Sequence, residues 1–200
     1  MAALPDDVTT RQQMTPAEYL AFERASETKH EYINGEIIAM TGASKNHNRI
    51  VSSVIAALYP QLANRPCDIF PSDMRLKIHA ELYTYPDVSI VCGKAEFEEV
   101  ETDTLLNPTV IIEVLSPSTA QYDRGVKFRH YRTLGSLQEY VMIAQDSVHL
   151  EHYVRQGDQW LLTDVDKPDV VVALASIDCT LAVSSVYEKV SFETEEQDNP

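Results

Sequence analysis

Two acidic residues, Asp87 and Glu113, each interrupt a short run of apolar residues, and this setting raises the question of what compensates them. Glu113 lies in VIIEVL, a segment typical of a strand buried on both faces. Asp87 lies in YPDVSIV, where Pro86 favours the start or the edge of a strand. A carboxylate removed from water destabilises the fold unless it is paired or binds a metal. If the two strands are neighbours, the carboxylates converge, and a hard cation such as Mg²⁺ would relieve their repulsion.

Simpler explanations exist for each acid considered alone. Either could form a salt bridge with an Arg or Lys from elsewhere in the chain, or could be exposed at the end of its strand. The segment after Glu113 favours a shared site, because it leads through residues 116–119 into a helix that carries several cations. We predict that this helix, AQYDRGVKFRHYRTL, is ended by Gly135.

Lys127 is the cation of this helix whose position is most informative. At 100° per residue, one broad face of the helix carries Arg124, Lys127, Tyr131 and Leu134. Because Tyr131 and Leu134 are expected to pack, Lys127 would point inward or along the rim. Its ammonium could there orient an attacking water or hold a phosphate oxygen. The alternative is an i,i+4 ion pair with Asp123 on a solvated helix.

Hydrophobic spacing and capping signals predict the elements that position these residues. TPAEYLAFERA combines a capping box with proline at the first helical position and predicts a helix to about Ala25. The dipeptide NG at 34–35 predicts a hairpin turn, and apolar spacing predicts a second helix over about 46–63. Strands are predicted over SDMRLKI, YPDVSIV, TVIIEVL and EYVMIA, with TVIIEVL central. SVHLEHYV, QWLLTDV and VVAL are predicted to continue the sheet, before a last helix around 181–190.

The length of 200 residues favours one domain with its own core. We expect a disordered start over residues 1–13, a single domain over 14–190 and an acidic tail over 191–200. The formal net charge of −15 disfavours loose electrostatic adhesion to nucleic acid or to an anionic membrane.

The three cysteines are odd in number, widely spaced and without a CxxC pair, so we expect reduced core residues. No apolar run approaches the ~20 residues of a membrane span, and the first residues lack the pattern of a signal peptide. A cytoplasmic protein that does not bind membranes is therefore expected.

Several motifs, in order along the chain, together resemble one known family. These are GEIIAMTGASKNHNRIV, FPSDMRLKI, YPDVSIV, VIIEVLSPST, YDRGVKFRHYRTLG and EYVMI. From about Met14 to Val190 the chain resembles the Uma-type family of restriction endonucleases, a bacterial group within the PD-(D/E)XK nuclease superfamily. The resemblance implies an α/β fold with a restriction-endonuclease-like mixed sheet flanked by helices. An N-terminal helix and hairpin and C-terminal strands would be added to it.

The resemblance also implies roles for particular residues. Asp87 matches the acid of the PD element and Glu113 the second acid, and together with the backbone carbonyl of Val114 they would hold Mg²⁺, for which Mn²⁺ could substitute. The superfamily pattern E-x-K would place a lysine at position 115, where this chain has Leu115. Family members are similar in supplying the lysine from the following helix, which here is Lys127.

Other residues are weaker candidates. His47, Asp73 and Glu31 are secondary candidates for the cleft, although a cap or surface role explains each of them equally well. His149 and His152 in HLEH are not expected to share a metal, because an odd separation along a strand places side chains on opposite faces.

The implied chemistry is Mg²⁺-dependent hydrolysis of phosphodiester bonds in DNA, with Arg124 as a substrate-binding residue. A homodimer is expected, because nucleases that cut two strands often act as paired subunits. The negative net charge and the lack of a recognisable DNA-reading module count against this function. The chain could instead be a catalytically inactive nuclease-fold protein with a binding or regulatory role. A third reading is a phosphoesterase that acts on small substrates.

Overall fold

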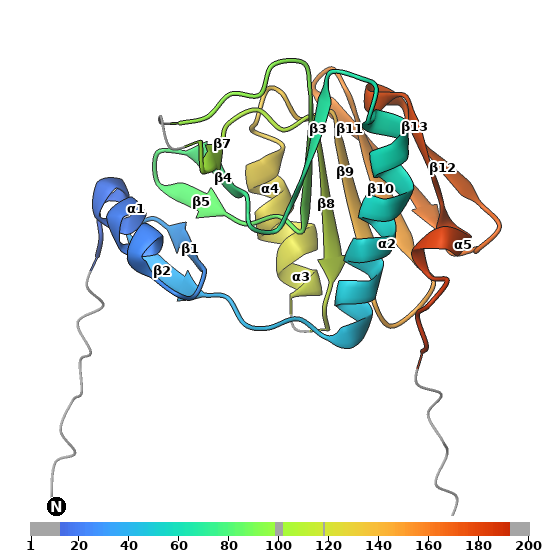
Figure 1. The fold of residues 1–200 in the computed structure, drawn as a ribbon, viewed down its shortest axis with the longest axis horizontal. Coiled ribbons are helices and arrows are strands. Elements are labelled where there is room, and N and C mark those ends of the chain that lie inside the picture. Colours follow the sequence, from blue (N-terminus) through green and yellow to red (C-terminus); the bar gives the residue numbers. More distant parts are fainter. Residues whose placement is uncertain (1–12, 99–101, 118, 193–200) are drawn as a thin grey trace, which may run out of the picture.

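The computed structural model describes residues 13–98, 102–117 and 119–192, and most of the predicted start and tail lies outside these ranges. Its main body is a six-stranded mixed sheet in the order β11-β10-β9-β8-β6-β3, flanked by helices (Figure 1). The strands are β3 (Cys67–Pro71), β6 (Val88–Cys92), β8 (Val110–Leu115), β9 (Glu139–Ala144), β10 (Leu150–Gln156) and β11 (Gln159–Val165). This arrangement confirms the predicted fold class.

Strand β8 lies inside the main sheet because it is apolar on both faces. All six of its residues are buried, and it pairs in parallel with β9 and antiparallel with β6. Ile112 and Val114 belong to one hydrophobic core, whereas Ile111 and Leu115 belong to the core on the opposite face. Alternation places Glu113 on the face of Ile111 and Leu115. The prediction that this strand is central is confirmed.

Helical segments cover both faces of the main sheet. On one face, α2 (Lys45–Leu62) packs a row of apolar residues at helical spacing into the core, as predicted: Ile50, Val54, Leu58 and Leu62. Ser44 caps this helix, since its side chain accepts a hydrogen bond from the backbone N–H of His47. Within the described ranges, no helix is both long enough and apolar enough to cross a membrane.

The opposite face is covered by the helical segment that follows β8. It consists of α3 (Ala120–Tyr122), a π-helical turn (Asp123–Lys127) and α4 (Phe128–Tyr131), so it ends before the predicted stop at Gly135. In the π-helical turn, side chains no longer follow the 100° spacing of an α-helix. Arg124 contacts Glu151 of β10 and Lys127 contacts Glu113 of β8, and both acids lie beside Met142 on the same face of the sheet.

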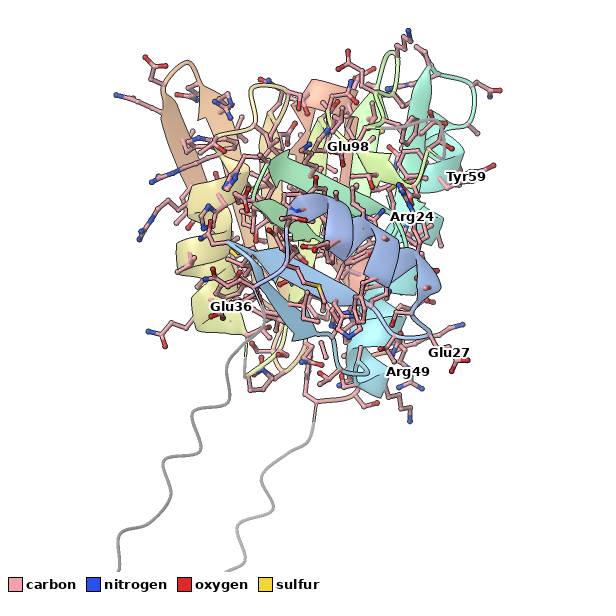
Figure 2. The ribbon with its side chains drawn as sticks, turned by 90° about the vertical axis from the view of Figure 1, so that its left-hand side faces the viewer. Arg24, Glu27, Glu36, Arg49, Tyr59 and Glu98 are labelled. Atoms are coloured by element: carbon pink, nitrogen blue, oxygen red, sulfur yellow. A yellow bond between two sulfur atoms is a disulfide. The ribbon has the colours of Figure 1, made fainter. Side chains whose placement is uncertain are left out.

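A second sheet of five strands, in the order β2-β1-β5-β4-β7, carries the N-terminal helix α1 (Pro16–Ala25), which lies in front in Figure 2. Its strands are β1 (His30–Ile33), β2 (Glu36–Ala39), β4 (Arg75–His79), β5 (Leu82–Thr84) and β7 (Thr104–Leu105). The predicted capping box is present between Thr15 and Glu18. The predicted hairpin turn is also confirmed, since Asn34 and Gly35 have φ values of 49° and 92°.

The C-terminal part differs from the prediction. Strand β12 (Val171–Leu174) pairs with β13 (Cys179–Ala182) in a separate two-stranded sheet and does not extend the main sheet. The helix predicted around 181–190 is reduced to α5 (Val183–Val186). The physical reason is that Val172, Leu174 and Leu181 bury their side chains in the core beneath α2. The apolar residues of this segment therefore pack the two-stranded sheet of β12 and β13 against α2.

Cys67 and Cys92 form a disulfide between β3 and β6, so the expectation of three reduced cysteines was wrong for this pair. The two residues are 25 positions apart in the chain, but they face each other in the antiparallel register with their Cα atoms 4.1 Å apart. Sheet register decides whether two cysteines meet, and spacing along the chain does not reveal it. Cys179 is a free, buried cysteine, as predicted.

Candidate active site

Asp87 and Glu113 lie opposite each other on neighbouring strands. β6 and β8 pair with Val88 opposite Ile112, and extending this register by one residue places Asp87 opposite Glu113. The backbone N–H of Asp87 lies 3.3 Å from Oε2 of Glu113. Oδ2 of Asp87 accepts a 2.7 Å hydrogen bond from the backbone N–H of Val114. The two acidic side chains therefore meet at one end of the β6–β8 pair.

Glu113 is 4% exposed, and two side chains of the following helical segment contact its carboxylate. Its Oε1 accepts a 2.8 Å hydrogen bond from the Tyr131 hydroxyl and lies 2.9 Å from Nζ of Lys127. Burial raises the pKa of Glu113 to about 8 despite the opposing charge of Lys127, and the negative charge of Asp87 adds to the rise. Glu113 therefore holds a proton more readily in the folded chain than an exposed glutamate does.

Lys127 joins acids from three parts of the chain. Its Nζ lies 2.9 Å from Glu113 on β8, 3.6 Å from Glu31 on β1 and 3.6 Å from Asp123 within the π-helical turn. Burial opposes its charge, but these three carboxylates together raise the pKa of Lys127 well above its usual value. Lys127 points inward as predicted, and the alternative pair with Asp123 is present as well.

His47 reaches the acid pair from the opposite side of the sheet. It lies in the first turn of α2, and its Nε2 is 3.0 Å from Oδ1 of Asp87. Burial alone would lower the pKa of His47, but the hydrogen bond and charge of Asp87 outweigh burial and raise it. Of the three secondary candidates, His47 and Glu31 are therefore part of the cluster.

Asp73, the third secondary candidate, lies away from the acid pair. Its side chain is 87% exposed and pairs with Lys29 at 3.0 Å. It precedes β4 of the second sheet, whereas Asp87 is next to β6 of the main sheet, so nearness in sequence does not bring them together.

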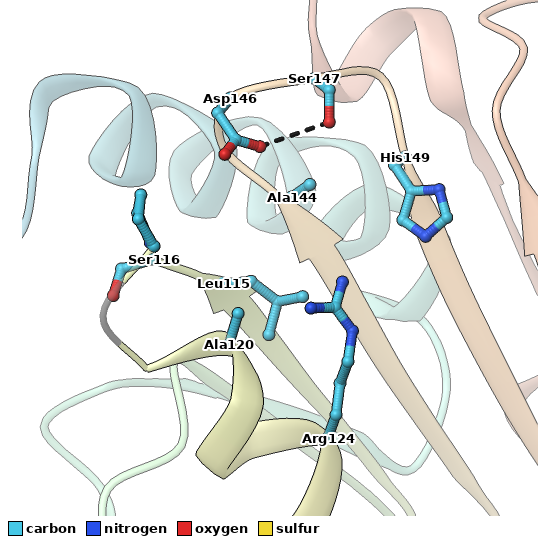
Figure 3. A pocket seen from close by; sticks show the side chains of 9 residues that line it. Leu115, Ser116, Ala120, Arg124, Ala144, Asp146, Ser147 and His149 are labelled. Carbon is cyan, nitrogen blue, oxygen red and sulfur yellow. Dashed lines mark hydrogen bonds between the residues drawn. The ribbon is translucent and has the colours of Figure 1, made fainter.

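Arg124 lines a pocket of about 120 Å³ at the ends of β8 and β9 (Figure 3). Its Nε forms an ion pair with Glu151 of β10, and it extends between Leu115 and His149 in the pocket wall (Figure 3). His149 also lies near Glu151, at 3.6 Å, whereas His152 pairs with Glu139. The two histidines thus have different partners.

Two tyrosines around Lys127 were not predicted to take part in the site. Tyr131 was assigned only a packing role, yet its hydroxyl binds Glu113, and the 4-residue steps from Asp123 to Lys127 to Tyr131 were the signal for this group. Tyr122 of α3 is also nearby, since burial and the charge of Glu31 raise its pKa to about 12. The sequence contains no comparable signal for Tyr122.

The donor set suits a hard divalent cation. Mg²⁺ prefers oxygen ligands and keeps several waters. Asp87 and Glu113 present carboxylates beside the backbone of Val114, in surroundings that disfavour a second bare negative charge. In the ranges that the structure describes, no three His, Cys, Asp or Glu side chains form a metal-binding group. A cation here would therefore need the Val114 carbonyl and waters to complete its ligands.

The mixed sheet, its flanking helices and the acid pair on neighbouring strands define a restriction-endonuclease-like α/β protein. The chain belongs to the Uma2 family, described as "Putative restriction endonuclease", whose model matches residues 16–184. This membership confirms the resemblance found in the sequence motifs. The fold is similar to the crystal structure of a putative nuclease belonging to DUF820 from Anabaena variabilis, with a TM-score of 0.69 and 23% sequence identity. The similarity covers 88% of this chain and 98% of that chain.

Two proteins of Synechocystis sp. are similar over most of their length. The uncharacterized protein sll1609 is 44% identical over 160 residues, which cover 79% of this chain and 90% of that protein. The uncharacterized protein slr1290 is 36% identical over 182 residues, which cover 90% of this chain and 94% of that protein. The similarity therefore extends beyond the motifs of the site.

Proposed function

We propose that this protein is a Mg²⁺-dependent endonuclease that hydrolyses phosphodiester bonds of DNA. The observation that carries the proposal is the contact between Lys127 and Glu113, with Asp87 opposite Glu113 on the neighbouring strand. Two acids and one cation at the end of a strand pair form the inventory that metal-assisted phosphodiester hydrolysis requires. Membership of the Uma2 family supports a nuclease.

Asp87, Glu113 and the Val114 carbonyl would hold the Mg²⁺ ion. When bound, the ion would neutralise charge on the substrate phosphate and lower the pKa of a bound water. Oε1 of Glu113 faces Lys127 and Tyr131, whereas Oε2 lies beside the backbone N–H of Asp87. Oε2 is therefore the oxygen that we assign to the metal.

Lys127 would stabilise the negative charge that develops on the phosphate as the bond breaks. Its raised pKa keeps the ammonium charged, and Glu31 and Asp123 hold it from two further directions. These two acids would position the lysine without contacting the substrate.

His47 would be a positioning residue for Asp87. Nε2 of His47 binds Oδ1, and the N–H of Val114 binds Oδ2, so these two contacts fix the orientation of the Asp87 carboxylate.

Arg124 would bind a substrate phosphate from the neighbouring pocket, because it is the cation in the pocket lining and about two-fifths of its side chain is exposed. A cytoplasmic location and a homodimer complete the proposal.

One observation favours a second candidate, a catalytically inactive nuclease-fold protein with a binding or regulatory role. All four carboxylate oxygens of Asp87 and Glu113 already have a partner within the chain. The two candidates differ in their response to metal. Mg²⁺ or Mn²⁺ should raise the melting temperature of an enzyme, and this rise should vanish in Asp87→Ala; no rise in the parent protein supports the inactive binding protein.

The decisive experiment is a nicking assay on supercoiled plasmid with Mn²⁺ at low salt, where weak binding still registers. The proposal predicts nicked product with the parent protein and none with Glu113→Gln. Equal nicking by both proteins would point to a contaminating nuclease, and no nicking by either would overturn the proposed activity.

A further inference from the structure

A groove beside the site carries positive charge in a chain whose formal net charge is −15. It has a volume of about 700 Å³ and lies between α2 and the segment from α5 to the C-terminal end of the described chain. Lys45, Arg49 and Lys189 line it, and Glu188 is the one acid of its described lining. The other lining residues are serines, alanines and an asparagine, so the floor is mostly small and partly polar.

The three cations of the groove have no acidic partner in the part of the chain that the structure describes. Basic residues elsewhere are commonly paired: Arg24, Lys29, Arg65, Arg75, Lys77, Arg124 and Lys127 each form an ion pair. Unpaired cations gathered in one groove of an acidic protein create a local positive potential, which attracts an anionic partner.

The groove begins at the end of the main sheet where the acid pair lies. Lys45 and Arg49 flank His47 in the first turns of α2, and His47 contacts Asp87. Ser44, which caps α2, hydrogen-bonds Gln145 directly after β9. In Figure 2, Arg49 lies towards the end of α2 that is farthest from Tyr59. A ligand in the groove would therefore run alongside the helix that positions Asp87.

The other wall of the groove is joined to α2 at the same end. The side-chain amide of Asn46 donates a 2.9 Å hydrogen bond to the backbone carbonyl of Ser191. Val183 and Val186 of α5 are buried in the core with the inner face of α2. Lys189 is therefore held on a wall that is packed against the helix carrying Lys45 and Arg49.

We infer that this groove binds the phosphodiester backbone of duplex DNA next to the bond to be cut. The inference rests on the proposed function and adds the surface that holds the substrate. Phosphates are the partner that suits these three cations best, because contacts with a phosphate backbone need positive charge and hydrogen-bond donors, which the serines and the asparagine of the lining also supply. The net charge of −15 then coexists with DNA binding because the positive charge is local.

The test measures binding separately from cutting. Binding of a fluorescent DNA duplex is followed by anisotropy over a range of salt concentrations, in a Glu113→Gln background that does not cut. The variant Arg49→Ala/Lys189→Ala should reduce the slope of log K against log salt by roughly two and weaken binding at least about tenfold. The matched control is Lys94→Ala/Lys167→Ala, which removes the same charge at exposed positions outside the groove and should bind like the parent.

Three results would overturn the inference: no binding by the parent, unchanged binding by the groove variant, or equal loss in the control variant. All four substituted side chains are at least partly exposed, so unchanged melting temperatures are expected and exclude unfolding as a cause. A nicking assay on the protein that retains Glu113 distinguishes this inference from the catalytic proposal. Binding that depends on the groove without nicking would refute the catalytic proposal alone, whereas nicking with binding that ignores the groove would refute this inference alone.

Discussion

Nζ of Lys127 lies 2.9 Å from Oε1 of Glu113, and this contact joins the π-helical turn to the buried strand β8. Lys127 is 8% exposed and Glu113 is 4% exposed, so neither charge can rely on water for compensation. A buried ion pair in such a setting makes each partner necessary to the other.

Replacing Lys127 with methionine should therefore destabilise the protein as well as inactivate it. Removal of one partner from a buried ion pair costs roughly 3–5 kcal/mol, because the other charge is left without compensation. Urea unfolding at about pH 9, above the folded-state pKa of Glu113 of about 8, measures this loss with the carboxylate ionised. The double variant Lys127→Met/Glu113→Gln should recover part of it, since the orphaned carboxylate is then gone; full additivity of the two single changes would contradict a direct interaction.

The stability of the metal-free protein should fall as the pH rises towards 8. The pKa of Glu113 is raised from 4.5 to about 8 in the folded state, so between these values the folded chain holds a proton that the unfolded chain releases. Stability must then decrease with rising pH across that window. Urea midpoints measured in a chelator between about pH 5 and 8 test this sign. The variant Glu113→Gln should show a flatter profile, and a parent profile that rises across the window would refute the raised pKa.

Asp103 should stabilise the protein at neutral pH and lose its effect in acid. Its Oδ2 lies 2.8 Å from Arg24 of α1 and 2.9 Å from Arg75 of β4. The hydrogen bond from Arg24 holds the pKa of Asp103 well below its usual value, against the opposing effect of burial. A lowered pKa gives stability that is present above about pH 4 and is lost as the pH falls through the folded-state pKa. Asp103→Asn should be less stable than the parent at neutral pH, with a smaller difference near about pH 2. An equal difference at both pH values would exclude this ion pair as the cause.

The disulfide between Cys67 and Cys92 should stabilise the fold under oxidising conditions. It closes a loop with a sequence separation of 25 residues, and the chain-entropy model assigns such a loop about 3.5 kcal/mol. The double variant Cys67→Ser/Cys92→Ser should therefore melt at a lower temperature than the oxidised parent, whereas Cys179→Ser tests the free cysteine separately. Mass spectrometry that finds three free thiols without added reductant would contradict the bond.

Local patterns in the sequence predicted much of the fold. The apolar run around Glu113 marked β8 as central, the capping box marked the start of α1, and NG marked the first hairpin. Each of these signals acts within a few residues, because burial period, capping and turn geometry are local requirements. The inward direction of Lys127 was also predictable, since the helix after β8 needs one apolar face.

Features that depend on contacts between distant elements were not predictable in the same way. The Cys67–Cys92 bond depends on the β3–β6 register, and Glu31 reaches Lys127 from a different sheet. The separate ribbon of β12 and β13 follows from packing against α2, which the apolar spacing of VVAL does not distinguish from an edge strand. The π-helical turn likewise has no signal in the spacing of its residues.

Glu31 lies on β1, which is part of the first hairpin and of the second sheet, whereas both central acids lie at one end of the β6–β8 pair of the main sheet. A shortened chain starting at Lys45 would retain the whole main sheet, and yet the ammonium of Lys127 would lose one of its three carboxylate neighbours. The N-terminal hairpin therefore contributes to the charge around Lys127, and a partner that pulled β1 away would change that charge without touching the sheet that bears the two central acids.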